Sequence, residues 1–276
     1  MIKIKSIIEK LRKYLVSFNE IKYFFCYSKS MEKTGGRSVK KIIYHILLIF
    51  CIFAFCISAW KLYGYYRSYK EAKDTYSRIQ QESVENISNI SNNERRIHFD
   101  KLRAQNKDVV GWVYIKGTTI DYPIVQGKDN EEYLHQDFNR KKSSSGTIFL
   151  DHNCNKNFTS DNNIIYGHHM KNQTMFAQLL KFREDSFYKK HQTIILYTPK
   201  KTIRLKVISA YASKAQDNVP VMFAKEKQKN AYIKKIQSKS ECTVKDITGK
   251  TGHIYTFVTC SYEREDNRTY VHAVEE

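Results

Sequence analysis

The sequence predicts a mostly β protein in which eight strands close into a barrel, with one membrane-spanning helix before it. Many short runs rich in β-branched and aromatic residues follow residue 108, and few helical patterns and only three prolines occur in the 276-residue chain. Many short strands with few helices are typical of a closed barrel. A third observation, an uncharged apolar run around residue 50, predicts the membrane helix.

The barrel strands are expected wherever a β-branched and aromatic run is bounded by polar or turn residues. In chain order they are residues 109–116, 120–126, 147–151, 163–166, 193–198, 203–212, 254–260 and 269–274. Shorter helical patterns interrupt them at residues 131–136, 175–182 and 223–237. The last of these is inserted between the sixth and seventh strands, and this late, long helix is the unusual feature of the predicted barrel.

Residues 42–60 form the predicted membrane anchor. Nineteen residues without a formal charge lie between Lys41 and Lys61, about the length that crosses a ~30 Å hydrocarbon core as a helix. The run is too long for the apolar part of a signal peptide, so we expect it to stay uncleaved. Residues 1–41 hold eleven Lys or Arg against three Asp or Glu. This excess predicts a cytoplasmic N-terminus, with the chain beyond residue 60 outside the cell.

The basic segment, residues 1–41, begins with apolar residues at helical spacing among lysines and an arginine. Such a helix fits an anionic membrane surface. An alternative is that this first stretch is absent from the mature protein, because Met31 starts a sequence that would itself lead into a membrane helix.

Residues 61–93 are expected to form an extracytoplasmic stalk, helical at first and then a polar linker from residue 86. The globular domain is expected over residues 94–276. A short helix over residues 94–105 should open it, with Asn92 or Asn93 as the N-cap.

The net charge of +19 is unevenly placed, because residues 1–41 supply +8 and the remainder +11. With 13% aromatic residues the chain is not a disordered polycation. A nucleic-acid-binding role would need a basic stripe on a recognisable module, and the sequence contains none.

Three of the six cysteines, Cys154, Cys242 and Cys260, fall outside the predicted membrane helix on its extracytoplasmic side. At least one of three thiols must be free unless it pairs between chains, and a bridge between Cys154 and Cys242 is conceivable. Cys260 ends a predicted strand, and Arg268 opens the next one. A hairpin of that length would bring this thiol and this guanidinium into one pocket. The alternative is a core cysteine with a solvated arginine.

A second chemical landmark follows the strand over 163–166, where Gly167 leads into His168 and His169. Neighbouring residues of an extended segment point to opposite faces, so only one histidine can meet Cys260. A strand-end histidine with a cysteine and an arginine fits thiol acyl transfer, in which the thiolate attacks, the imidazole moves protons and the guanidinium stabilises the oxyanion. Reference pKa values make the thiolate–imidazolium form about one per cent of the neutral pair.

The run from Thr256 to Cys260, Thr-Phe-Val-Thr-Cys, resembles the TLxTC signature of the sortases, transpeptidases that attach proteins to Gram-positive cell walls, with Phe257 in place of leucine. Gly167-His168 and Arg268 match the family's histidine and arginine. Stretches at 111–115, 120–126 and 166–170, and the helix at 223–237, resemble class B in particular. The resemblance extends from about residue 94 to the C-terminus.

This resemblance implies that Cys260 attacks the carbonyl of the Thr in the C-terminal sorting signal of a secreted protein. His168, as general acid, releases the downstream peptide. A peptidoglycan or pilin amine then resolves the thioester. It further implies a substrate groove formed by Asn130, Leu134, Tyr166, Val258 and Thr259. No metal or other cofactor is expected.

Two other interpretations compete with this one. The exterior domain could be a non-catalytic, membrane-anchored binding module in which Cys260 is a buried thiol. Alternatively, Asp151, His152 and Cys154 could form a zinc site with His168 and His169. Structural zinc sites usually use tighter paired spacings, which disfavours the second alternative.

Overall fold

The structure is a computed structural model that describes residues 37–87, 95–215, 219–244, 251–261 and 267–276. The chain divides into two units, Met1–Gly64 and Tyr65–Glu276. Most of the basic N-terminal segment and both expected capping residues, Asn92 and Asn93, lie outside the described residues.

A single long helix, α2 (Arg37–Ser83), contains both the expected membrane anchor and the expected stalk helix. Its first part carries large exposed apolar side chains, and Phe50, Phe55 and Trp60 are 68%, 73% and 75% exposed. Such a surface is unfavourable in water. Because the helix is also long and apolar enough to cross a bilayer, α2 is a candidate membrane span.

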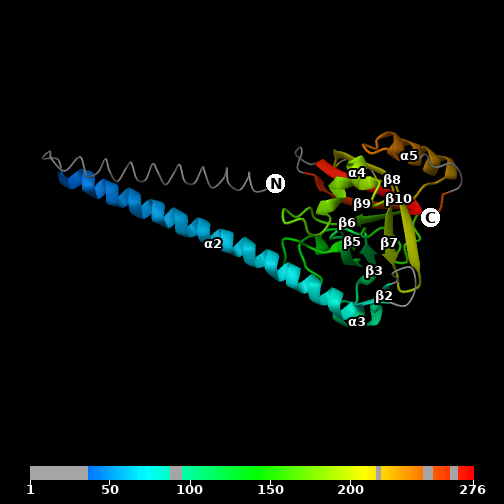
Figure 1. The fold of residues 1–276 in the computed structure, drawn as a ribbon, viewed down its shortest axis with the longest axis horizontal. Coiled ribbons are helices and arrows are strands. Elements are labelled where there is room, and N and C mark those ends of the chain that lie inside the picture. The colour runs from blue at the N-terminus through cyan, green and yellow to red at the C-terminus, as the bar shows by residue number, and fades with distance from the viewer. Residues whose placement is uncertain (1–36, 88–94, 216–218, 245–250, 262–266) are drawn as a thin grey trace. The chain divides into compact units, whose positions relative to one another are not determined.

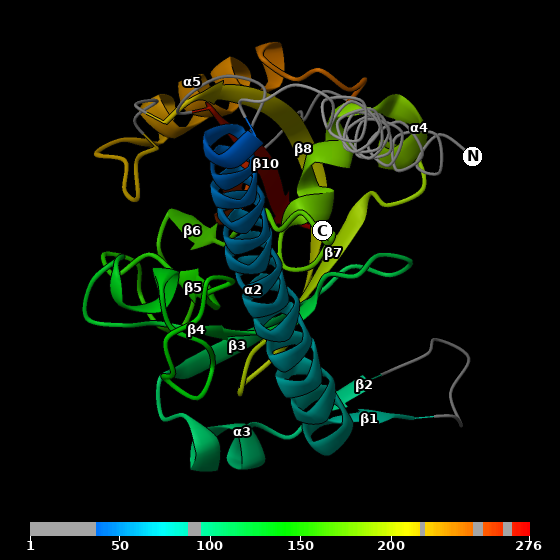
Figure 2. The ribbon, with the colours of Figure 1, turned by 90° about the vertical axis from the view of Figure 1, so that its left-hand side faces the viewer.

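Eight strands of the second unit form a closed barrel, as the sequence predicts (Figures 1 and 2). They are β3 (Val109–Tyr114), β4 (Asp121–Val125), β5 (Ile148–Leu150), β6 (Asn162–Tyr166), β7 (Thr193–Tyr197), β8 (Thr202–Lys214), β9 (Ile254–Ser261) and β10 (Asn267–Glu275). Around the barrel the order is β10-β8-β7-β3-β4-β5-β6-β9. The pairs β4–β5 and β6–β9 are parallel, and the other pairs are antiparallel. Strand β9 therefore lies between a parallel neighbour, β6, and an antiparallel neighbour, β10.

The end of α2 belongs to the same unit as the barrel. Tyr76 and Ile79 are buried in the barrel's apolar core, at 5% and 0% exposure. The Tyr76 hydroxyl donates to the carbonyl oxygen of Gly146 at 2.8 Å. Residues 65–83 of the expected stalk thus lie in the same compact unit as the barrel.

The sequence prediction is wrong at the start of the helix expected over residues 94–105. Residues Arg95–Ile97 form β2, which pairs with β1 (Val84–Asn86), and helix α3 (Phe99–Gln105) follows with His98 at its N-cap. The reason is tertiary. The Arg95 guanidinium donates to both carboxylate oxygens of Asp121 at 3.1 and 2.8 Å and lies 4.0 Å from the centre of the Tyr114 ring. These contacts hold the segment extended against β3 and β4.

The three helical patterns inside the barrel sequence are all present, two of them as 3-10 helices. These are η2 (Glu132–Leu134) and η3 (Ala177–Arg183), and a short helix, α4 (Asp185–Tyr188), follows η3. Helix α5 (Glu226–Ser238) lies between the sixth and seventh barrel strands, as predicted. It packs against β8, where the Ser209 hydroxyl donates to the carbonyl oxygen of Ile236 (Figures 1 and 2).

A buried histidine, His272, lies on β10 beside β8 and β9 and is fully buried. The Thr256 hydroxyl donates to the Asn162 side-chain oxygen at 2.7 Å, so it must accept from His272 Nδ1 at 2.9 Å. In this tautomer Nε2 accepts from the Tyr211 hydroxyl at 3.3 Å. Burial, assisted by Lys239, lowers the pKa of His272 to about 3.

This lowered pKa predicts an acid-sensitive fold. In the unfolded chain His272 takes up a proton as the pH falls through ~6.5, whereas in the folded state it stays neutral, so stability is lost below that pH. Between pH 7 and pH 5 the wild type should lose about 2 kcal/mol more unfolding free energy than His272→Gln. Urea unfolding of both proteins at the two pH values measures this difference. Equal losses would contradict the assignment, because every other histidine is common to the two proteins.

Candidate active site

Cys260 and Arg268 are cross-strand partners. In the antiparallel ladder of β9 and β10, Cys260 is directly opposite Arg268, and Thr259 is opposite Thr269. The register of β9 is fixed by core residues earlier in the strand, because Tyr255 and Phe257 are fully buried. The predicted hairpin geometry for this pair is confirmed. The connecting residues 262–266 lie outside the described part of the chain.

Strand β6 brings His168 to the same end of the barrel. Tyr166 pairs with Val258 in the parallel ladder of β6 and β9, and the Gly167 N–H continues it by donating to the Val258 carbonyl oxygen at 3.1 Å. A Cβ atom on Gly167 would collide with the Phe176 ring, so only glycine allows this close passage. The chain then places His168 one residue beyond the ladder.

The ring of His168 is fixed by one hydrogen bond. Its Nε2 lies 2.7 Å from the carbonyl oxygen of Leu134. A carbonyl oxygen only accepts, so Nε2 donates and Nδ1 carries the lone pair of the neutral ring. Its neighbour His169 instead forms a β-bridge with Met175.

A cavity of about 270 Å³ gathers these elements. It is lined by Asn130, Glu131, Leu134, Phe149, Tyr166, Gly167, His168, Val258, Thr259 and Arg268. All five residues expected in a substrate groove are among them, together with the expected histidine and arginine. His169 is not. Thr259 immediately precedes Cys260 in β9.

The sequence reasoning missed Glu131, Phe149 and Gly167 as lining residues. Phe149 lies in an expected strand, but its place in the wall depends on pairing with Tyr166, whose ring centre is 5.3 Å away. That β5 and β6 are neighbours follows from the strand order of the barrel, and neither strand's own sequence shows it. Glu131 lies beside Asn130, and this adjacency was the only available signal.

Comparison with known proteins decides the family. Residues 113–276 match the model of the sortase domain. The chain belongs to the sortase family. It is 35% identical over 172 residues to sortase B of Staphylococcus aureus (strain NCTC 8325 / PS 47), covering 60% of this chain and 68% of that protein. It is 33% identical over 175 residues to sortase B of Listeria monocytogenes serovar 1/2a (strain ATCC BAA-679 / EGD-e), covering 63% and 71%.

Solved structures of sortase B superpose on this chain. The X-ray structure of Clostridium perfringens sortase B superposes with a TM-score of 0.60 at 35% identity, covering 64% of this chain and 99% of that one. Sortase B from B. anthracis in complex with AAEK1 gives 0.65 at 29% identity, covering 76% and 98%. The chain is accordingly a class B sortase, a cysteine transpeptidase.

Cys154 and Cys242 are free thiols in the interior of this sortase, so the conceivable bridge between them is not formed. Cys154 Sγ accepts from the Ile164 N–H at 3.4 Å and donates to the Asn162 carbonyl oxygen at 3.5 Å. Burial raises the pKa of Cys154 to about 11 and also raises that of Cys242. Neither is an activated thiol.

The zinc alternative rested on Asp151, His152 and Cys154 beside two histidines. Within the described residues, no group of three or more His, Cys, Asp or Glu side chains is arranged to hold a metal ion. Asp151 and Cys154 are instead hydrogen-bonded to their own loop and to neighbouring strands.

Gly146 supports the carbonyl group that holds His168. Its φ of 54° is in the left-handed region. A Cβ atom there would lie 2.7 Å from the Leu134 oxygen and 2.8 Å from the Tyr133 oxygen. Only glycine fits this point without pushing the two carbonyl groups away.

Gly146→Ala should therefore displace the Leu134 carbonyl group and release the His168 ring, at a cost of about 1–3 kcal/mol in unfolding free energy. Thermal unfolding should show a lower Tm, and the imidazole nitrogen NMR shifts of His168 should move. Gly252→Ala is the matched control, because its nearest neighbour would be 3.7 Å away. A Tm as high in Gly146→Ala as in Gly252→Ala would contradict this account.

Proposed function

We propose that this sortase cleaves a C-terminal sorting signal of a secreted protein after Thr and transfers the acyl group to an amine of peptidoglycan or of a pilin. One observation carries the proposal: a single cavity is lined by His168, Arg268 and Thr259, and Arg268 is the cross-strand partner of Cys260. A nucleophile, a proton carrier and an oxyanion donor are the groups that thiol acyl transfer requires.

In the first half of the reaction, the Cys260 thiolate attacks the Thr carbonyl carbon and an oxyanion develops on the carbonyl oxygen. The Arg268 guanidinium donates to that oxygen. His168, as imidazolium, gives its proton to the leaving amine while the C–N bond breaks. The products are a thioester on Cys260 and a free downstream peptide.

In the second half, an amine of the acceptor attacks the thioester carbonyl. Neutral His168 takes a proton from the amine as the new C–N bond forms, and the thiolate leaves. His168 and Cys260 thereby return to their starting protonation states. The Leu134 carbonyl group fixes Nε2 throughout, so Nδ1 is the nitrogen that exchanges the proton.

The rest of the cavity wall binds the peptide. Leu134 and Val258 offer apolar contact, and Asn130, Tyr166 and Thr259 offer polar groups. A cavity of about 270 Å³ accommodates a few side chains, which suits a short sorting motif better than a folded partner.

The membrane topology that we propose follows the charge pattern. Residues 42–60 cross the membrane, residues 1–41 stay cytoplasmic because of their Lys and Arg excess, and the barrel lies outside the cell. The catalytic domain is then held near the surface where secreted proteins emerge.

The decisive experiment uses the full chain in detergent and an internally quenched peptide library with one fixed Thr and randomised flanking positions. Cys260→Ala should abolish cleavage and also the covalent acyl-enzyme adduct seen by mass spectrometry. Cys154→Ala and Cys242→Ala should retain both, since burial raises the pKa of each of these thiols. Turnover that survives in Cys260→Ala but is lost in Cys154→Ala would overturn the assignment.

The role of Arg268 gives a second prediction. Arg268→Ala should lower kcat by about 10²–10³, the range for removal of an oxyanion donor. Arg268→Lys should restore little, because a point charge does not reproduce the planar fork of a guanidinium. Arg204→Ala is the control, since Arg204 is 61% exposed and pairs with Glu276. Cleavage kinetics on the three variants measure this, and full activity in Arg268→Ala would remove the arginine from the mechanism.

A further inference from the structure

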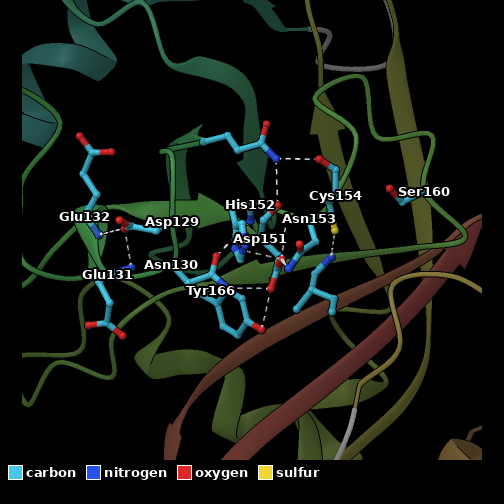
Figure 3. A network of polar contacts seen from close by, with 12 residues as sticks. Asp129, Asn130, Glu131, Glu132, Asp151, His152, Asn153, Cys154, Ser160 and Tyr166 are labelled. Carbon is cyan, nitrogen blue, oxygen red and sulfur yellow. Dashed lines mark hydrogen bonds and ion pairs between the residues drawn. The ribbon is translucent and has the colours of Figure 1, made fainter.

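A buried carboxylate lies directly behind the cavity. Asp151 follows β5 and is 5% exposed, and it is not itself a lining residue. Its N–H donates to the Ile164 carbonyl oxygen at 2.8 Å, which extends the pairing of β5 with β6. Figure 3 shows its side chain at the centre of a polar network with Asn130, Asn153 and Tyr166.

The two oxygens of this carboxylate have different partners. Oδ1 accepts from the backbone N–H of Asn153 at 2.9 Å and from the Asn153 side chain at 3.2 Å. The Asp151 carbonyl oxygen accepts from the Cys154 N–H at 2.9 Å. Oδ1 and the carbonyl oxygen of Asp151 are therefore bonded within its own loop, and these contacts fix the carboxylate in place.

Oδ2 points the other way and contacts the cavity wall. It accepts from Asn130 Nδ2 at 2.9 Å and from the Tyr166 hydroxyl at 3.2 Å (Figure 3). Both of these residues line the cavity with His168 and Arg268. A carboxylate needed only for the loop would not require these two partners.

Because a carboxylate only accepts, it decides the polarity of both neighbours. The Tyr166 hydroxyl must donate to Asp151, which leaves its oxygen lone pairs as acceptors. Burial and the Asp151 charge raise the pKa of Tyr166, so this hydroxyl keeps its proton. The Asn130 amide must turn Nδ2 to Asp151, and its Oδ1 accepts from the His152 N–H at 3.0 Å. One amide hydrogen of Asn130 is then left to donate.

We propose that Asp151 is a positioning residue for the sorting peptide: it locks Asn130 as a donor and Tyr166 as an acceptor in the cavity wall, where they pair with a carbonyl and an N–H of the bound peptide backbone. An extended peptide alternates these two groups, so the fixed pair selects both its placement and its direction. This inference rests on the proposed function, since it assumes that the cavity binds the peptide.

The test measures kcat and KM of the full chain in detergent for the peptide that the wild type cleaves best from the fixed-Thr library. Asp151→Ala should raise KM about tenfold, as expected when hydrogen bonds to the peptide lose their alignment, and change kcat less than about twofold. Asn153→Ala is the matched control: it removes one side-chain hydrogen bond to Oδ1, but the backbone N–H of Asn153 still holds that oxygen and both Oδ2 contacts remain, so KM should stay within about twofold.

Asp151→Asn covers the possibility that the alanine variant fails to fold, because it keeps the shape of the side chain. Both carboxylate oxygens face donors, so the amide nitrogen must oppose a donor on one side. Its KM should also rise, by less than in Asp151→Ala. Labelling of Cys260 by iodoacetamide should keep the wild-type rate in both variants.

A double-variant background tests whether Asp151 acts through its neighbours. In Asn130→Ala/Tyr166→Phe, adding Asp151→Ala should change KM less than about twofold. Wild-type KM in both Asp151 variants, or an undiminished effect in this background, would overturn the proposal alone. If the wild type cleaves no library member, the proposed function fails and this proposal fails with it.

Discussion

The pairing of β9 with two different strands is the constraint on which the site depends. Strand β9 closes the barrel, because it runs parallel to β6 and antiparallel to β10. The first pairing sets Val258 beside Tyr166 and so brings His168 to this end. The second sets Cys260 opposite Arg268. Residues of β9 and β10 and the residue that follows β6 therefore come to one end of the barrel because of one strand, and a register shift of one residue in either ladder would separate them.

Hydrogen bonds to polar groups behind the cavity each hold a lining side chain in one orientation. The Leu134 carbonyl group fixes the His168 ring, and Asp151 fixes Asn130 and Tyr166. A second buried network, Thr256 with Asn162 and His272, ties β9 to β6 and β10. Buried polar groups are costly unless they are paired, so each of these networks also favours one strand register over its neighbours.

The barrel also depends on residues before its first strand. Asp121 accepts from Arg95 of β2 and from the Trp112 indole N–H, which donates at 2.7 Å. Its carbonyl oxygen accepts from Gln80 of α2. Tyr76 of the same helix holds Gly146, whose neighbours include the carbonyl group that binds His168. The helix that continues the candidate membrane span thus contributes directly to the support of the site.

The sequence by itself determined which segments become strands, where the long helix is inserted, and which residue types come to the site. The reason is that the periodicity of apolar residues, and a Cys, a His and an Arg at strand ends, can be recognised within short stretches of sequence. It placed a helix at residues 95–97, where contacts of Arg95 with Asp121 and Tyr114 outweigh local preference. Only the tertiary structure decided the strand order, the wall position of Phe149 and the two-sided role of Asp151. These depend on which strands become neighbours, and that is a property of the closed barrel and not of any single run of residues.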